Sequence, residues 1–164
     1  MKTTNKIPAI LVILLTLGFY ACTDDEYPIN IPFSNYDGYS LSSSYAFETL
    51  ENGVPVIINS EQELRCYFDS TESYIMPNFA KQSLIAIYGG STTKSIRRVE
   101  KRLEQTGDKN YKLYLDLYVW SYPTSPNYKE TLLVNKLPSN AIITAIVTEH
   151  DSDGADVISD TVYL

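Results

Sequence analysis

The sequence predicts a mainly β domain of the α+β class, built as an antiparallel, sandwich-like sheet with one short helix near residues 60–68. Three observations support this fold class. In YKLYLDLYVW, residues 111–120, apolar and polar side chains alternate, which is typical of a half-buried strand. SLIAIYGG, residues 83–90, is apolar and rich in isoleucine and ends at two glycines, which suits a central buried strand. Ser60-Glu61-Gln62-Glu63 matches a capping box, which marks the start of a helix.

Turn residues predict the first strands of the domain. Asn-Gly at 52–53 is the strongest short-range hairpin signal, and it joins residues 44–50 to residues 54–59. Because Pro55 has no backbone N–H, the second segment is expected at a sheet edge, or as a strand that begins at Val56.

The second half of the chain predicts further strands. Residues 95–105 fit both helical spacing and strand alternation, and the turn TGDKN at 106–110 with the strand after it favours a strand. After the proline-rich loop at 121–128, three more strands are predicted at residues 131–137, 141–149 and 156–164.

The N-terminus has the three parts of a secretory signal. Lys2 and Lys6 precede an apolar stretch over residues 7–17, and the small residue Ala21 stands before the expected cut. This stretch is too short to cross a bilayer, because a spanning helix needs roughly 20 apolar residues. The sequence therefore predicts a signal peptide at residues 1–21.

Cys22 and its surroundings resemble a bacterial lipoprotein signal. The bulky Phe19 and Tyr20 and the acidic TDDE at 23–26 are similar to the signals of Bacteroides-group lipoproteins. The resemblance implies that Cys22 becomes the first residue of the mature chain and carries acyl chains, which anchor a protein stably when several are present. It implies an outer-membrane lipoprotein of the cell envelope, on the periplasmic or the surface side. The alternatives are a plain signal peptide and an uncleaved anchor.

After cleavage the chain is long enough for one domain with a core. Residues 22–43 are acidic and contain prolines, so they are expected to form the lipidated N-terminus and a flexible tether, or an extended lead-in to the fold; residues 44–164 form a single β-rich globular domain. The formal charge of −7 excludes nucleic acid as a partner. The basic cluster at 94–102 is interrupted by Glu100 and predicts a solvated strand face, with contact to an anionic partner as the alternative.

One further resemblance covers residues 56–138. The order of the capped helix SEQELRCYF, the strand NFAKQSLIAIYGG, the hairpin around TGD and the polar loop before LLVNKLP is similar to the C-terminal domain of the PrcB-type protease-complex subunit family. Gly89-Gly90 matches the family, whereas the glycine that the family has before its next strand is missing here between Ser91 and Ile96. The resemblance implies a small accessory domain with no catalytic residues of its own, acting as an accessory or inhibitory subunit of an envelope protease.

The candidate catalytic residues are Cys66 and His150. If Cys22 is acylated, Cys66 has no intramolecular partner and is expected to be a small core residue among its apolar neighbours. His150 is the only histidine, which excludes a multi-histidine metal site. A Cys66–His150 pair would need two distant segments to meet. The sequence has no phosphate-binding loop, nucleophile elbow or paired-cysteine zinc motif, so neither a catalytic residue nor a cofactor is assigned, and an envelope hydrolase is the less favoured alternative.

The acidic segment after the strand at 141–149 is expected to be a plain turn. Asp151, Asp153 and Asp156 supply the oxygen ligands that calcium prefers, so a weak calcium site is the alternative. Its glycine, Gly154, stands at the fourth position of the segment, whereas an EF-hand loop has its glycine at the sixth.

Aromatic residues in and beside the proline-rich loop are candidates for a recognition surface. Trp120, Tyr122 and Tyr128 offer large contact area for a protein or glycan partner. The alternative is that Tyr118 and Trp120 cover a sheet face beneath the loop. The sequence therefore favours a non-enzymatic, lipid-anchored binding module, and no pattern in it specifies an oligomeric state.

Overall fold

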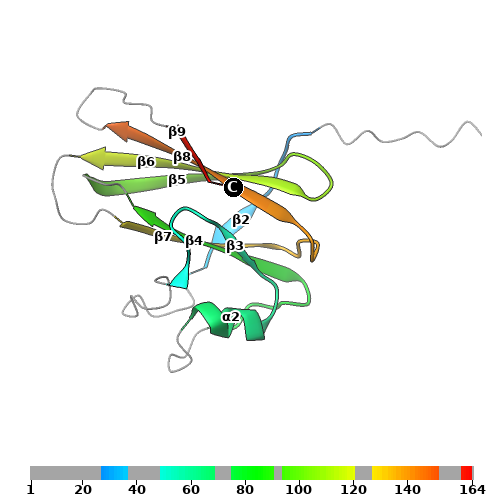
Figure 1. The fold of residues 1–164 in the computed structure, drawn as a ribbon. Coiled ribbons are helices and arrows are strands. Elements are labelled where there is room, and N and C mark those ends of the chain that lie inside the picture. Colours follow the sequence, from blue (N-terminus) through cyan, green and yellow to red (C-terminus); the bar gives the residue numbers. More distant parts are fainter. Residues whose placement is uncertain are drawn as a thin grey trace, which may run out of the picture.

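The protein is a sandwich of two β-sheets with one helix packed on its outside, as the computed structural model shows in Figure 1. The structure describes residues 27–36, 49–68, 75–90, 94–120 and 127–151 and the backbone of 160–163. Sheet A has the strand order β1 (Ile29–Asn30), β5 (Ser95–Gln105), β6 (Asn110–Trp120), β8 (Ile142–Asp151) and β9 (Asp160–Tyr163). Sheet B has the order β2 (Phe33–Asn35), β7 (Asn127–Asn135), β4 (Gln82–Gly90) and β3 (Val56–Ile58). The predicted fold class, mainly β with one short helix, is confirmed.

Strand β6 forms the middle of sheet A. Its buried side chains alternate with partly exposed ones, as the sequence predicted, and the buried set is Tyr111, Leu113, Leu115, Leu117 and Val119. On one side β6 pairs antiparallel with β5, which is confirmed as a strand. On the other side it pairs parallel with β8, from Asn110 opposite Ile142 to Val119 opposite Asp151. The sheet is therefore not purely antiparallel, because the intervening strand β7 belongs to sheet B.

Strand β4 lies inside sheet B, between β7 and β3, and is buried on both faces. Ile85 and Ile87 belong to the core between the sheets, whereas Leu84 and Ala86 belong to the cluster under the helix. Burial on both faces explains why this segment is continuously apolar instead of alternating.

Helix α2 (Glu61–Tyr67) covers the outer face of sheet B and begins with the predicted cap. Ser60 Oγ accepts a hydrogen bond from Glu63 N at 3.2 Å. Glu63 Oε2 accepts from the backbone N–H of Asn59, one residue before the position that the capping box predicts. Leu64 and Phe68 share the buried face, as expected from their spacing of four.

The chain joins the sandwich earlier than the sequence indicated. β1 pairs with β5 and β2 pairs with β7, so residues 29–35 contribute a strand to each sheet. Of the two expectations for residues 22–43, a flexible tether or an extended lead-in to the fold, residues 29–35 fit the extended lead-in, and they pair with the domain that was expected to begin at residue 44. Residues 22–26 lie outside the described residues.

The predicted turn at Asn52-Gly53 is present. Val54 N donates to Glu51 O at 3.1 Å, and Gly53 has a φ of 77°, which favours glycine. The strand after the turn begins at Val56 and lies at the edge of sheet B, as Pro55 predicted, and it pairs with β4. Its predicted hairpin partner lies mostly outside the described residues.

Candidate functional site

The outer face of sheet A carries arginines stacked on aromatic rings. We define the arginine–aromatic face as Arg97, Arg98 and Arg102 of β5 with Tyr114, Tyr118 and Trp120 of β6. The aromatic residues lie on the side of β6 that faces away from the core, because they alternate with its buried leucines and valine.

Each arginine of this face lies over one ring. The guanidinium carbon is 4.0 Å from the ring centroid of Tyr118 for Arg98 and 3.9 Å from that of Tyr114 for Arg102. A third stack joins Arg97 to Trp120 at 5.7 Å. All three distances are within the range in which a cation is attracted by an aromatic ring.

A β-bulge at Arg97 brings two consecutive arginines to the same side of the sheet. Ile96 pairs with Val119 and Arg98 pairs with Tyr118, so β5 has one residue more than β6 between these two pairs. A bulge interrupts the alternation of side chains along a strand. Both Arg97 and Arg98 therefore reach rings on the outer side, where a regular strand would turn one of them toward the core.

Carboxylates on β5 hold two of the stacked arginines. Arg98 forms an ion pair with Glu100 at 3.1 Å, and Arg102 forms one with Glu104. Tyr118 Oη also donates to Glu100 Oε2 at 3.2 Å. The pKa of Tyr114 is raised, first by burial and then by its hydrogen bond to Glu104 and the negative charge there. These contacts link the arginines, the rings and the carboxylates of this face to one another.

His150 extends this arrangement onto β8. Its ring stacks on Tyr118, with centroids 5.0 Å apart and an angle of 21° between the planes. His150 Nε2 lies 2.8 Å from Asp116 Oδ1. Because β6 lies between β5 and β8, Arg98 and His150 approach Tyr118 from opposite sides. Among the described residues, the contacts of the histidine are therefore with the aromatic ring of Tyr118 and the carboxylate of Asp116.

The predicted recognition residues have different positions. Trp120 is 38% exposed and lies on the arginine–aromatic face. Tyr128 is 4% exposed, so its prediction as a surface residue is wrong. Its ring occupies the space left by Gly89, the residue opposite it on β4, which has no side chain. Tyr122 lies outside the described residues.

The predicted calcium segment is described only at its first residue. The carboxylate of Asp151 forms an ion pair with Lys94 Nζ, so it already has a cationic partner. Asp153 and Asp156 lie outside the described residues. Within the part of the chain that the structure describes, no group of three or more His, Cys, Asp or Glu side chains could hold a metal ion.

Cys66 is exposed on α2, so its prediction as a core residue is wrong. It stands two residues from Leu64, whose side of the helix is buried, and residues two apart do not share a helix face. The thiol instead donates to Gln62 O at 3.3 Å. Since α2 covers sheet B and His150 lies on the outer face of sheet A, the structure does not bring Cys66 and His150 together.

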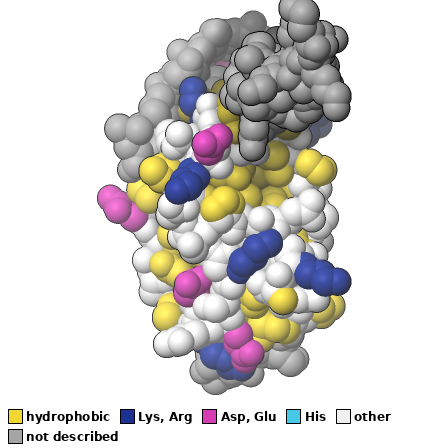
Figure 2. Space-filling model, turned by 90° about the vertical axis from the view of Figure 1, so that its right-hand side faces the viewer, with side chains coloured by type: hydrophobic (Ala, Val, Ile, Leu, Met, Phe, Trp, Pro, Cys, Tyr) yellow, Lys and Arg dark blue, Asp and Glu magenta, His cyan; other side chains and the backbone are white. Residues whose placement is uncertain are grey.

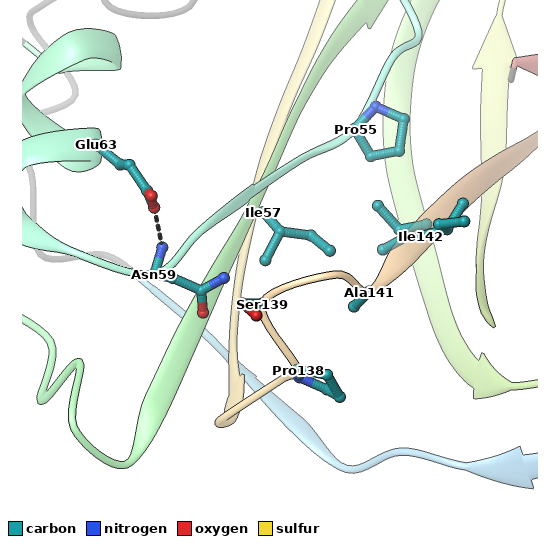
Figure 3. A pocket seen from close by; sticks show the side chains of 9 residues that line it. Pro55, Ile57, Asn59, Glu63, Pro138, Ser139, Ala141 and Ile142 are labelled. Atoms are coloured by element: carbon teal, nitrogen blue, oxygen red, sulfur yellow. Dashed lines mark hydrogen bonds between the residues drawn. The ribbon is translucent and has the colours of Figure 1, made fainter. Parts of the chain in front are cut away.

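A second candidate site is an open groove of about 390 Å³ between β3 and the start of β8. In Figure 3, Pro55 and Ile142 lie near each other, Ile57 lies between them and Asn59, and the hydrogen-bonded pair Asn59 and Glu63 lies toward the helix. Ile142 is 62% exposed. Glu63, the carboxylate in its lining, already accepts a hydrogen bond from Asn59 N.

Figure 2 shows one end of the molecule, on which hydrophobic side chains are exposed among scattered Lys, Arg, Asp and Glu.

None of the helices in the described part of the chain is both long and apolar enough to span a bilayer. No family model, curated protein or solved structure matches the chain.

Proposed function

We propose that this protein is a non-enzymatic, lipid-anchored binding module of the cell envelope, and that it binds a protein partner on the arginine–aromatic face. The observation that carries the proposal is the row of three arginines stacked on three aromatic rings on one exposed sheet face. Arginine, tryptophan and tyrosine are the residue types that dominate the binding energy of protein interfaces.

The stacks favour binding because they order the side chains in advance. A free arginine loses much rotamer freedom when a partner immobilises it. Here the rings and the carboxylates of Glu100 and Glu104 already hold Arg98 and Arg102. A partner therefore meets arginines whose conformations are already restricted by the rings and carboxylates beside them.

Protein is favoured over glycan as the partner. A sugar ring would stack on an open aromatic face, but Tyr118 is flanked by Arg98 and His150, and Tyr114 is covered by Arg102. The edges of the guanidinium groups remain available as hydrogen-bond donors, and these suit the carbonyl and carboxylate groups of a polypeptide.

The binding proposal is tested by photo-crosslinking in cells with the full-length chain. The crosslinking amino acid replaces Lys112, an exposed residue on the same side of β6, or Gln62 on the exposed side of α2 as a matched control. We expect a discrete adduct from position 112 only, and its loss when Arg98→Ala and Trp120→Ala are added. Equal adducts at both positions, or an adduct that survives the double substitution, contradict the proposal. An adduct that contains a protease would favour the accessory or inhibitory role that the PrcB-type resemblance implies.

The anchor is tested separately. Labelling with a fatty acid and mass spectrometry of the mature N-terminus should show acylated Cys22, and Cys22→Ser should release the protein from membranes. A mature chain that begins elsewhere, or a Cys22→Ser variant that stays membrane-bound, would refute the lipoprotein prediction and leave the binding proposal to its own test.

A further inference from the structure

Arg97 differs from the other two arginines of the arginine–aromatic face. Arg98 and Arg102 each form an ion pair with a glutamate two residues further along β5. Among the described residues, Arg97 contacts the ring of Trp120 and forms no ion pair. In the part of the chain that the structure describes, the two glutamates thus balance Arg98 and Arg102, whereas Arg97 at the bulge has no ion pair.

The bulge adds Arg97 to the exposed side of β5. It interrupts the pairing of β5 with β6, and its extra residue is an exposed arginine. Without Arg97 the ladder would continue directly from Ile96 opposite Val119 to Arg98 opposite Tyr118. Bulges commonly redirect a side chain next to a functional site.

We propose that Arg97 binds a carboxylate of an acidic segment in the protein partner. This inference rests on the proposed function and names the chemistry of the partner. The guanidinium carbon lies over the Trp120 ring, 5.7 Å from its centroid, and the Arg97 side chain is exposed, so a partner can reach its N–H groups. Two parallel N–H groups match the two oxygens of an Asp or Glu side chain.

The charge of the surroundings supports an acidic partner. The chain as a whole carries a formal charge of −7, whereas Arg97 is an exposed cation for which no ion pair is found among the described residues, so an acidic segment is attracted at this position. The Trp120 side chain, 38% exposed, offers apolar contact beside the charge. Arg97 and Trp120 together offer a charged group beside aromatic surface, a combination that is common at the hot spots of protein interfaces.

The experiment selects random dodecapeptides on the full-length protein in lipid nanodiscs. Selected peptides are made again with Asn and Gln in place of Asp and Glu, and their affinities are measured by fluorescence anisotropy. We expect acidic peptides to be selected and to lose about tenfold in affinity with Arg97→Ala, close to the loss of one charged contact. The matched control Arg65→Ala removes an exposed arginine from α2, on the other side of the molecule, and should leave affinity unchanged.

Deleting Arg97 provides a second variant, because it brings Ile96 and Arg98 into one continuous register with β6. We expect the deletion to abolish the binding of acidic peptides. If the deletion variant does not fold, the affinity of acidic peptides for Arg97→Ala, which keeps the bulge, tests the inference instead. Failure to select peptides, selection of neutral peptides, or acidic peptides that bind Arg97→Ala equally well overturns the inference. Stronger competition by uronate or sulfated glycans overturns it in favour of an anionic glycan. If the crosslink from position 112 still forms in any of these cases, the protein still binds a protein partner on this face, but that partner does not bind through an acidic segment.

Discussion

Replacing Gly89 with alanine should destabilise the protein through Tyr128. A Cβ atom on residue 89 would lie 2.3 Å from Tyr128 Oη, 2.5 Å from Cζ and 2.8 Å from Cε1. Side-chain Cβ atoms essentially never come closer than 3.0 Å to another heavy atom. The Tyr128 ring would have to move by about 1 Å in a packed interior, because it is 4% exposed.

We expect Gly89→Ala to lower the free energy of unfolding by about 2 kcal/mol, the usual loss when a core is overpacked by one methyl group. Gly107→Ala is the matched control. Its Cβ would lie 3.2 Å from the side-chain nitrogen of Asn110, an exposed residue at the β5–β6 turn that can adjust, so its effect should stay below about 0.5 kcal/mol.

A double-mutant cycle isolates the contact. Tyr128→Ala alone should cost about 3–5 kcal/mol, as the loss of a buried aromatic ring does. In that background Gly89→Ala should cost nothing further, which gives a coupling energy of about 2 kcal/mol. Urea denaturation followed by the fluorescence of Trp120, the single tryptophan, measures all four variants. An unchanged cost of Gly89→Ala in the Tyr128→Ala background would refute the steric explanation.

Three further predictions concern the cap, an inter-sheet ion pair and a buried phenol. Ser60→Ala should cost about 1 kcal/mol in urea denaturation and Ser60→Asp should not, because the cap accepts from Glu63 N; equal losses would refute its capping role. Glu130→Gln should cost about 2 kcal/mol in the same assay, because it leaves the largely buried ammonium of Lys101 without its carboxylate, whereas Lys101→Met combined with Glu130→Leu should recover most of the loss. A double variant no more stable than Glu130→Gln would contradict this. Burial raises the pKa of Tyr111 above 10.0, so the stability that its neutral phenol contributes is complete below about pH 10 and is lost as the pH rises through the folded-state pKa. Tyr111→Phe should therefore flatten the fall in unfolding free energy above about pH 10, and an unchanged slope would count against this assignment.

The strands that could be predicted are those whose burial is visible in local sequence. β6 is buried on one face and alternates, and β4 is buried on both faces and is continuously apolar. The capped helix could be predicted because Ser60 and Glu63 satisfy backbone groups of the same turn. In each case the pattern and its physical cause lie within about ten residues.

The bulge at Arg97 left a signal in the sequence that was open to two interpretations. Ile96 and Val99 both pack against the core, yet they are three residues apart, and a regular strand cannot place such residues on one face. This spacing is what made residues 95–105 compatible with a helix. A strand with one extra residue at Arg97 explains the same spacing. It also explains why the consecutive residues Arg97 and Arg98 both lie on the outer side of the sheet.

The features that the sequence did not predict depend on contacts between segments that are distant in the chain. Tyr128 is buried because Gly89 lies opposite it, 39 residues earlier in the chain. Residues 29–35 resemble a linker because each of their strands is only two or three residues long, and their partners on β5 and β7 decide their structure. The parallel pairing of β6 with β8 likewise depends on where β7 lies. Such pairings leave no periodic signal in either partner.

The position of β7 in the other sheet also sets the order in which the sandwich can fold. β5 and β6 are joined by a short turn and can form a hairpin early, because closing a short loop costs little chain entropy. β8 can complete sheet A only after β7 has crossed into sheet B and the chain has returned, so Asn110 meets Ile142 late. While β8 is still being synthesised, the edge of β6 that later pairs with β8 is unpaired, and the leucines of β6 are not yet covered. We therefore expect the chain to be prone to wrong association with other chains at this stage of synthesis.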